Sequence, residues 1–221
     1  MEDPDISHIT ESNFQKIYSP SEDTFLLCDA LTDEAEGIKE RNPKIGVEIG
    51  TGSGYVLAHV SRLFKNTDLF VFGIDINPLA AKLTSKTLTQ NGISRYEVIN
   101  CNLLNPFALD RFGSMIDLLI FNPPYVPTES KEIQFNPKDE ETWITSSFAG
   151  GLNGMEITQK LINQMDQLLS PHGVCYLIAI HENNPHQIAN DLAEKGFRTI
   201  VVKKKRLRGE LLYVLKIIRK K

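Results

Sequence analysis

The sequence has only three cysteines among its 221 residues, and they lie far apart at Cys28, Cys101 and Cys175. Because no CxxC pair is present and the five histidines lack metal-ligand spacing, neither a metal site nor a disulfide framework is expected. No run of 18 apolar residues is present, which argues against a membrane-spanning helix and against a membrane partner. The segment Met1–Glu11 is acidic and lacks an apolar stretch, so no signal or transit peptide is expected. These absences favour a reducing, cytoplasmic location, with a nuclear pool left open.

A strong net charge is also absent, because the formal value is only -4. The charges are nevertheless uneven: residues 1–36 carry 10 acidic and 1 basic side chain, whereas residues 203–221 carry 9 basic and 1 acidic. An acidic protein is a poor candidate for tight non-specific binding of nucleic acid, so a nucleic acid is not the favoured direct substrate. The basic run Lys203–Arg206 is interpreted as a solvated hairpin end, with docking to a ribosomal factor or RNA as the alternative.

Short apolar runs alternate with segments of helical periodicity along the chain. The predicted strands cover residues 45–49, 69–74, 97–100, 116–121, 174–180, 197–202 and 211–218. The predicted helices cover residues 52–65, 79–90 (with Pro78 in the first turn), 154–169 and 185–195. The segment Thr128–Ala149 is polar and lacks periodicity, and a loop of this length is usually functional.

This alternation predicts an α/β fold with a seven-stranded, mostly parallel sheet and helices on both faces. The last two strands are too close together for a helical crossover, so they are expected to form an antiparallel hairpin. We expect one domain over residues 1–221, with little chain left for a second domain.

A glycine-rich loop follows the first predicted strand and contains Gly50, Gly52 and Gly54. Glycines at this place let the backbone approach a ligand and direct free N–H groups toward it. The dinucleotide pattern GxGxxG would need glycine where the chain has Tyr55. Glu48 at the strand end is unfavourable beside a pyrophosphate, but it suits a cofactor with cationic groups, such as S-adenosylmethionine. A tight strand-to-helix turn without a ligand is the alternative.

Two polar residues follow the next strands. Asp75 lies 21 residues after Gly54, a distance at which an acidic residue typically accepts hydrogen bonds from ribose hydroxyls. Its alternative role is to cap the helix near Asn77. Asn102 is interpreted as a contact to the adenine edge, with a plain turn residue as the alternative.

The tetrad Asn122-Pro123-Pro124-Tyr125 follows the fourth predicted strand. Two prolines stiffen the backbone where the strand leaves the sheet. The side-chain oxygen of Asn122 and the carbonyl of Pro123 can each accept one N–H of a planar NH₂ group, and Tyr125 supplies a flat face. Such acceptors stabilise the positive charge that develops when an amide nitrogen attacks a methyl group. A proline turn that ends a strand is the alternative.

With this tetrad, the chain resembles the class I methyltransferases that depend on S-adenosylmethionine and have a Rossmann-like fold. Within them it is similar to the short HemK-like protein-glutamine methyltransferases of eukaryotes, over nearly its whole length. Three further segments carry the resemblance: Tyr18-Ser19-Pro20-Ser21-Glu22-Asp23-Thr24-Phe25-Leu26-Leu27, Gly150-Gly151-Leu152-Asn153-Gly154 and Glu182-Asn183-Asn184-Pro185. The first matches the pattern YxPxEDTFLL of the family, and it implies that residues 1–36 cover the cofactor site.

The resemblance implies a site residue by residue. Cofactor contacts are expected from Tyr18, Thr24, Glu48, Gly50, Gly52, Gly54, Asp75, Asn102, Leu103 and Asn122. The catalytic residues are expected to be Asn122, Pro123, Pro124 and Tyr125. The family usually has aspartate where this chain has Asn102, whose amide oxygen can still accept from the adenine amino group.

The resemblance also implies a reaction and its partners. The expected reaction is methylation of the glutamine amide nitrogen in the Gly-Gly-Gln loop of the eukaryotic class I translation release factor, with S-adenosylhomocysteine as the other product. A small zinc-binding activator protein is expected as a heterodimer partner. The alternatives are adenine-N6 methylation of DNA or RNA, methylation of lysine or a small molecule, and an inactive binding module.

Overall fold

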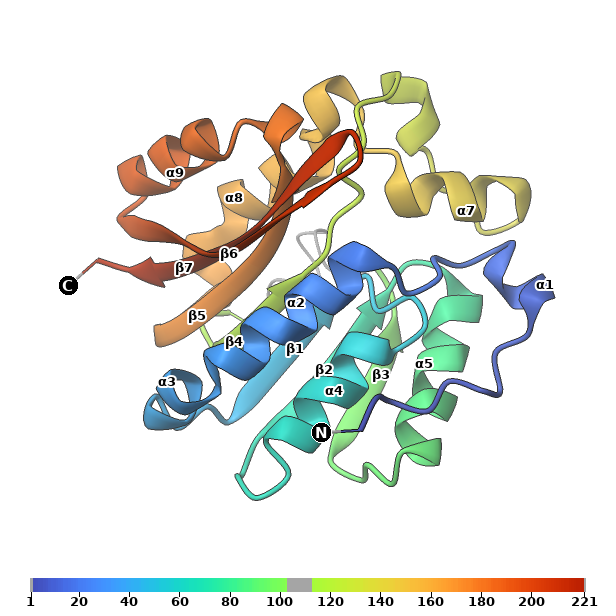
Figure 1. Cartoon of the computed structure of the whole chain (residues 1–221), viewed down its shortest axis with the longest axis horizontal. Helices are drawn as coiled ribbons and strands as arrows, with labels where there is room; N and C mark the ends of the chain where they lie inside the picture. Colours follow the sequence, from blue (N-terminus) through green and yellow to red (C-terminus); the bar gives the residue numbers. More distant parts are fainter. Residues whose placement is uncertain (1, 103–112, 221) are drawn as a thin grey trace.

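Seven strands form one sheet in the part of the chain that the structure, a computed structural model, describes: residues 2–102 and 113–220. Their order across the sheet is β3-β2-β1-β4-β5-β7-β6 (Figure 1). The strands are β1 (Ile45–Ile49), β2 (Phe70–Asp75), β3 (Tyr96–Asn100), β4 (Ile116–Phe121), β5 (Leu169–Ile180), β6 (Phe197–Leu207) and β7 (Glu210–Arg219). Strands β1 to β5 pair in parallel, whereas β7 is antiparallel to both β5 and β6. The predicted mostly parallel sheet with a C-terminal antiparallel hairpin is therefore confirmed.

Helices cover both faces of this sheet. They are α1 (Glu11–Phe14), α2 (Glu22–Asp33), α3 (Ala35–Glu40), α4 (Tyr55–Leu63), α5 (Pro78–Gln90), α7 (Glu141–Phe148), α8 (Glu156–Leu168) and α9 (Pro185–Glu194). Short 3₁₀ turns form η1 (Ser130–Ile133), η2 (Leu152–Gly154) and η3 (His181–Asn183). Helices α2 and α4 pack on one face, and α8 and α9 pack on the other. None of the described helices is both long and apolar enough to span a bilayer.

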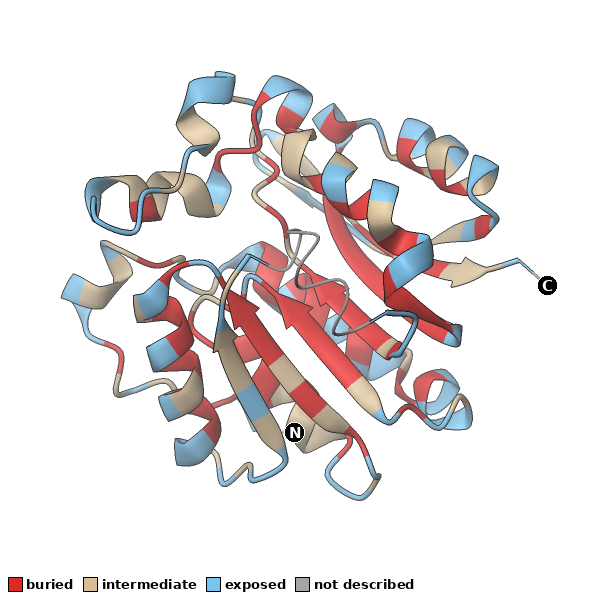
Figure 2. Cartoon of the chain, turned by 180° about the vertical axis from the view of Figure 1, so that it is seen from behind, coloured by how far each residue is buried: buried red, intermediate tan, exposed pale blue. Residues whose placement is uncertain are grey.

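The central strands are buried on both faces, which explains their continuous apolar runs (Figure 2). Along β5, Tyr176 and Ile178 join the core cluster under α2 and α4, whereas Cys175 and Leu177 join the cluster under α8 and α9. Successive side chains of a strand point to opposite faces, so one apolar strand contributes to two cores. The sheet is thereby packed on both faces, and the carboxyl ends of its parallel strands lie along one edge.

The last hairpin is longer than predicted, because β6 extends to Leu207. The basic run lies within β6 next to the turn, and Lys204, Lys205 and Arg206 are exposed, as predicted for a solvated hairpin end. Lys203 forms an ion pair with Asp33 of α2 at 2.6 Å, and Lys205 forms one with Glu22 at 2.5 Å. The acidic and basic ends of the chain, which are separate in the sequence, therefore neutralise each other in part across α2 and β6.

Two segments contain helices that the sequence patterns did not indicate. The segment Thr128–Ala149, predicted as a loop, contains η1 and α7. Trp143 of α7 is buried, stacks on Phe135 with ring centroids 6.4 Å apart, and donates from Nε1 to the carbonyl of Asn136. The N-terminal segment forms α1 and α2. Thr10 caps α1 in a capping box with Asn13, and Glu22 and Asp23 lie in the first turn of α2, where acidic side chains are favourable.

Candidate active site

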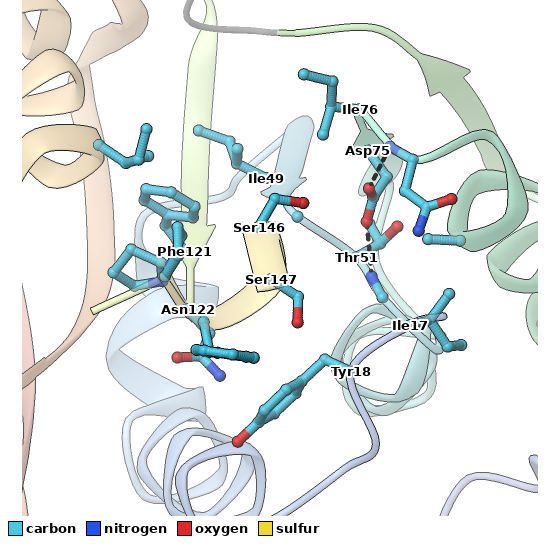
Figure 3. A pocket seen from close by; sticks show the side chains of 18 of the residues that line it. Ile17, Tyr18, Ile49, Thr51, Asp75, Ile76, Phe121, Asn122, Ser146 and Ser147 are labelled. Atoms are coloured by element: carbon cyan, nitrogen blue, oxygen red, sulfur yellow. Dashed lines mark hydrogen bonds between the residues drawn. The ribbon is translucent and has the colours of Figure 1, made fainter. Parts of the chain in front are cut away.

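A cavity of about 660 Å³ opens where the strands β1, β2 and β4 end (Figure 3). The strand order changes direction between β1 and β4, and this is the place where parallel α/β sheets bind ligands. The N-terminal segment from Ile17 to Thr24 forms one wall, and Ser146 and Ser147 of α7 lie on another. The predicted site residues and the unpredicted helix α7 therefore meet at one cavity.

The glycine loop joins β1 to α4 at the floor of this cavity. Gly50, Gly52 and Gly54 have φ values of 68°, 54° and 78°, in the left-handed region that favours glycine. Gly50 and Gly52 line the cavity, whereas Gly54 does not. A Cβ at Gly54 would lie 2.9 Å from the Cα of Thr84, so this glycine allows the loop to pack against α5.

Two carboxylates lie beneath the loop. Glu48 is 2% exposed, and its Oε2 atom has no hydrogen-bond partner among the described residues. Burial, followed by the nearby Asp75 carboxylate, raises the pKa of Glu48 well above its usual range. A buried carboxylate oxygen without a partner is costly unless a cation or a donor reaches it. The floor of the cavity therefore suits a ligand that carries a cationic group or a polar N–H.

Asp75 ends β2 and holds the glycine loop. Its Oδ2 accepts the backbone N–H of Gly52 and its Oδ1 accepts that of Asn77, both at 2.9 Å. Burial raises the pKa of Asp75 to about 6, although both of these hydrogen bonds act in the opposite direction. Asn77 caps α5 with its own side chain, which accepts from the N–H of Leu79. Asp75 is thus left with acceptor capacity toward the cavity, as a ribose contact requires.

The N-terminal segment lies over the opposite side of the cavity. Tyr18 lines the cavity, and the side chain of Asn77 donates to the carbonyl of Lys16 at 2.9 Å. Thr24 is buried and also lines the cavity. Both predicted residues of this segment are therefore at the cavity wall.

The tetrad lies where β4 leaves the sheet, and all four of its residues line the cavity. The Nδ2 atom of Asn122 donates to Oδ2 of Asp23 at 2.8 Å. Its Oδ1 atom is buried and has no hydrogen-bond partner within the described ranges. Tyr125 donates through its hydroxyl to the same Asp23 oxygen at 3.1 Å. Asn122 therefore keeps an unused acceptor at the cavity wall.

Asp23 belongs to the N-terminal motif of the resemblance, but no role in the site was predicted for it. It is 3% exposed and lines the cavity from the first turn of α2. The available signal was its place on the apolar face of α2, beside Leu26 and Leu27, because an isolated aspartate is rarely buried without donors around it.

The two remaining motifs of the resemblance pack behind the tetrad. The Nδ2 atom of Asn183 donates to the carbonyl oxygens of Tyr125 and Asn153, both at 2.9 Å. Its Oδ1 accepts the backbone N–H of Ile180 at 2.8 Å. A Cβ at Gly154 would lie 1.8 Å from the carbonyl oxygen of Tyr125. These motifs therefore hold the backbone of the tetrad rather than contact a ligand.

Of the two residues predicted on the adenine side, Asn102 is exposed and lines the cavity. Leu103 lies outside the described residues. No group of three or more His, Cys, Asp or Glu side chains that could hold a metal ion occurs in the described ranges.

Comparisons with known proteins agree with this geometry. A sequence profile described as "Methyltransferase domain" matches residues 44–216. The eRF1 methyltransferase catalytic subunit mtq2 of Schizosaccharomyces pombe is 35% identical, over 98% of this chain and 95% of that protein. Methyltransferase HEMK2 of Homo sapiens is 36% identical, over 95% of this chain and 92% of that protein.

A solved structure is similar as well. It is the E. cuniculi Mtq2–Trm112 complex, described as responsible for methylation of the eRF1 translation termination factor. It superposes with a TM-score of 0.61 and 26% identity, over 93% of this chain and 99% of that chain.

Proposed function

Since this chain belongs to the methyltransferase domain family, and within it to the HemK-like group with Mtq2 and HEMK2, we propose that it methylates a protein glutamine. The methyl group comes from S-adenosylmethionine, and the acceptor is the side-chain amide nitrogen. The target is the glutamine of the Gly-Gly-Gln loop of the eukaryotic class I translation release factor. The names of the fission-yeast relative and of the E. cuniculi complex, both of which refer to eRF1, support this target.

One observation carries the choice of an amide acceptor: the unpartnered Oδ1 of Asn122 in the cavity wall. An amide NH₂ group is a donor that satisfies this oxygen, whereas a carboxylate would leave it unpaired. The amide nitrogen gains positive charge as it attacks, so an acceptor at its hydrogen stabilises the transition state more than the ground state. Tyr125, whose ring lines the same wall, offers a flat surface for the planar amide.

The residues of the cavity floor fit S-adenosylmethionine. Glu48 has a buried oxygen without a partner, which a cationic ligand group would satisfy. Asp75 would accept from the ribose hydroxyls, the backbone of Gly50 and Gly52 would approach the ligand, and Asn102 would contact the adenine edge. Tyr18 and Thr24 would cover the cofactor and exclude water. When bound, the cofactor supplies an activated methyl group on a sulfonium.

The affinity for S-adenosylmethionine is expected to depend on pH through Asp75. The folded-state pKa of Asp75, about 6, exceeds the ordinary value of 3.8. The protonated form is therefore favoured in the folded protein. Its contribution to stability is fully present below pH 3.8 and is lost as the pH rises through 6. Cofactor binding has the opposite sign, because ribose hydroxyls donate to the ionised carboxylate. Calorimetry from pH 5 to pH 8 should therefore show an affinity that is nearly constant above pH 7 and falls about fivefold from pH 6 to pH 5.

The variant Asp75→Asn tests this assignment. It should weaken cofactor binding about tenfold above pH 7 and remove the part of the pH dependence centred near 6. The matched control is Asp68→Asn at an exposed position, which should leave both the affinity and its pH profile unchanged. An unaltered affinity in Asp75→Asn would remove the ribose role.

A partner is part of the proposal. The solved relative is a complex with Trm112, and we infer that this chain likewise forms a heterodimer with a small zinc-binding activator. Co-expression should yield a complex whose mass in solution equals the sum of the two chains. The methylation rate of the complex should exceed that of the chain alone, and a chain that is monomeric in the presence of the activator would contradict the inference.

The function itself is tested by methylating recombinant release factor with the co-expressed complex. Mass spectrometry should locate one added methyl group on the glutamine of the Gly-Gly-Gln loop. A release factor in which that glutamine is replaced should take up none. Equal incorporation into the altered factor would refute the proposal, and salt-dependent transfer to oligonucleotides instead would favour adenine methylation.

A further inference from the structure

Asp23 is a buried carboxylate that lies between the N-terminal segment and the tetrad. Its oxygens accept from four side chains: the hydroxyl of Tyr18 at 3.1 Å, Nδ2 of Asn122 at 2.8 Å, the hydroxyl of Tyr125 at 3.1 Å and the hydroxyl of Thr24 at 3.3 Å. The backbone N–H of Thr24 also donates to it at 2.7 Å. These donors come from α2, the residues before it and the end of β4, so one carboxylate connects the separate walls of the cavity.

Every group that contacts an ionised carboxylate must present a donor, because the carboxylate itself only accepts. An asparagine amide has an accepting and a donating end of nearly the same shape, and its surroundings decide which end points where. Beside Asp23, the NH₂ end of Asn122 is used. The Oδ1 end is therefore the one left without a partner, buried in a residue that lines the cavity.

Tyr18 and Tyr125 help to keep the Asn122 amide in this single orientation. Burial, and after it the Asp23 carboxylate, raises the pKa of Tyr18 and of Tyr125 above the ordinary value. Both hydroxyls therefore stay protonated at neutral pH and remain donors to Asp23. Neither tyrosine is therefore a negatively charged acceptor that competes with Asp23 for the NH₂ group of Asn122. The orientation in which Nδ2 faces Asp23 is thus favoured.

We propose that Asp23 is a positioning residue for methyl transfer, which acts through Asn122 by holding its amide with the oxygen toward the substrate. The inference rests on the proposed function, because it assigns the substrate amide as the donor that Oδ1 receives. It also gives a basis for specificity: Asn122 held in this way accepts from the NH₂ group of glutamine and rejects the acceptor-only carboxylate of glutamate. A turned amide would lose this preference.

The inference is tested by exchanging the side chains at positions 23 and 122. The enzyme is the co-expressed complex, and the substrate is the release factor. In Asp23→Asn, the new amide can present an NH₂ group to Asn122 and let it turn, so kcat should fall about 100-fold. Asn122→Asp places two carboxylates side by side and should be at least as slow. In the double variant, the amide at position 23 donates to the carboxylate at position 122, whose second oxygen is again an acceptor for substrate. Its rate should exceed that of Asn122→Asp alone by about tenfold or more.

A purely structural role of Asp23 gives the opposite result, because two disruptive changes would then add. A double variant no faster than Asn122→Asp, or an Asp23→Asn variant within threefold of the wild type, would overturn the inference. If Asp23→Asn does not fold, as judged by its thermal melt, the comparison of the double variant with Asn122→Asp decides alone. Asp29→Asn, an exposed position on the same helix, is the matched control and should keep the wild-type rate.

A second readout separates this inference from the proposed function. The side-chain NH₂ of Asn122, observed by ¹⁵N-correlated NMR, should exchange slowly with solvent in the wild type and quickly in Asp23→Asn. Wild-type protein that methylates no glutamine but shows this protection would refute the function and leave the orientation intact. Active wild-type protein with an unprotected Asn122 amide would refute the orientation alone.

Discussion

Replacing Asn122 with alanine is expected to slow methyl transfer to glutamine by about 1,000-fold, at the upper end of the effect of removing one preorganised group. The variant removes the buried Oδ1, which has no hydrogen-bond partner among the described residues, and leaves the backbone carbonyl of Pro123 in place. The loss should appear in kcat more than in KM, because the hydrogen bond strengthens as charge develops on the amide nitrogen.

The binding of S-adenosylmethionine at the floor of the cavity should be unaffected by Asn122→Ala. Glu48, Asp75 and the glycine loop belong to β1, β2 and the turn between β1 and α4, whereas Asn122 follows β4. Calorimetry should therefore give an affinity of Asn122→Ala for S-adenosylmethionine within about threefold of the wild type, since these contacts are nearly independent. Loss of cofactor binding in this variant would show that Asn122 serves the cofactor rather than the substrate.

Replacing Gly154 with alanine is expected to lower the free energy of unfolding by about 3 kcal/mol or more, because the new methyl group cannot be accommodated. Its Cβ would lie 1.8 Å from the carbonyl oxygen of Tyr125 and 2.6 Å from Nδ2 of Asn183. Tyr125 belongs to the tetrad and Asn183 holds its backbone, so relief of the clash must move the catalytic backbone. The melting temperature should fall by roughly 6 to 12 °C, and methyl transfer should fall with it.

Gly92→Ala is the matched control for this prediction. Gly92 has a φ of 70°, close to the 67° of Gly154, but a Cβ added there would meet no atom within 4 Å beyond its own chain neighbours. The control therefore reports the strain of a left-handed alanine alone, about 1 kcal/mol. If the two variants were equally destabilised, the contact with Tyr125 would not be the cause.

The parts of this site that lie at strand ends were predictable from the sequence. Each buried strand has a continuous apolar run, and Glu48, Asp75 and Asn122 stand at or directly after the ends of such runs. Since parallel strands place their carboxyl ends on one edge, the spacing along the chain was enough to bring these three residues to one cavity.

The contacts made by helices without a clear apolar stripe were not predictable. Helix α7 is short and carries one buried residue, Trp143, so it lacks the periodicity that marks an amphipathic helix. The contact of Asp23 with Asn122 joins residues 99 positions apart and depends on how α2 lies across the sheet. Local patterns contain no information on that placement.

The ion pairs between α2 and the last hairpin have a consequence for the order in which the protein is completed during synthesis. Helix α2 carries Asp23 and is made well before β7, but Glu34, the C-cap of α2, pairs with Lys216 of β7. Leu26 and Leu27 share a core cluster with Leu212 and Val214 of β7. A nascent chain thus emerges with its glycine loop long before the helix that orients Asn122 has its final support. The wall of the site that α2 forms, with Asp23 and Thr24, should accordingly reach its final packing only after β7 has been made.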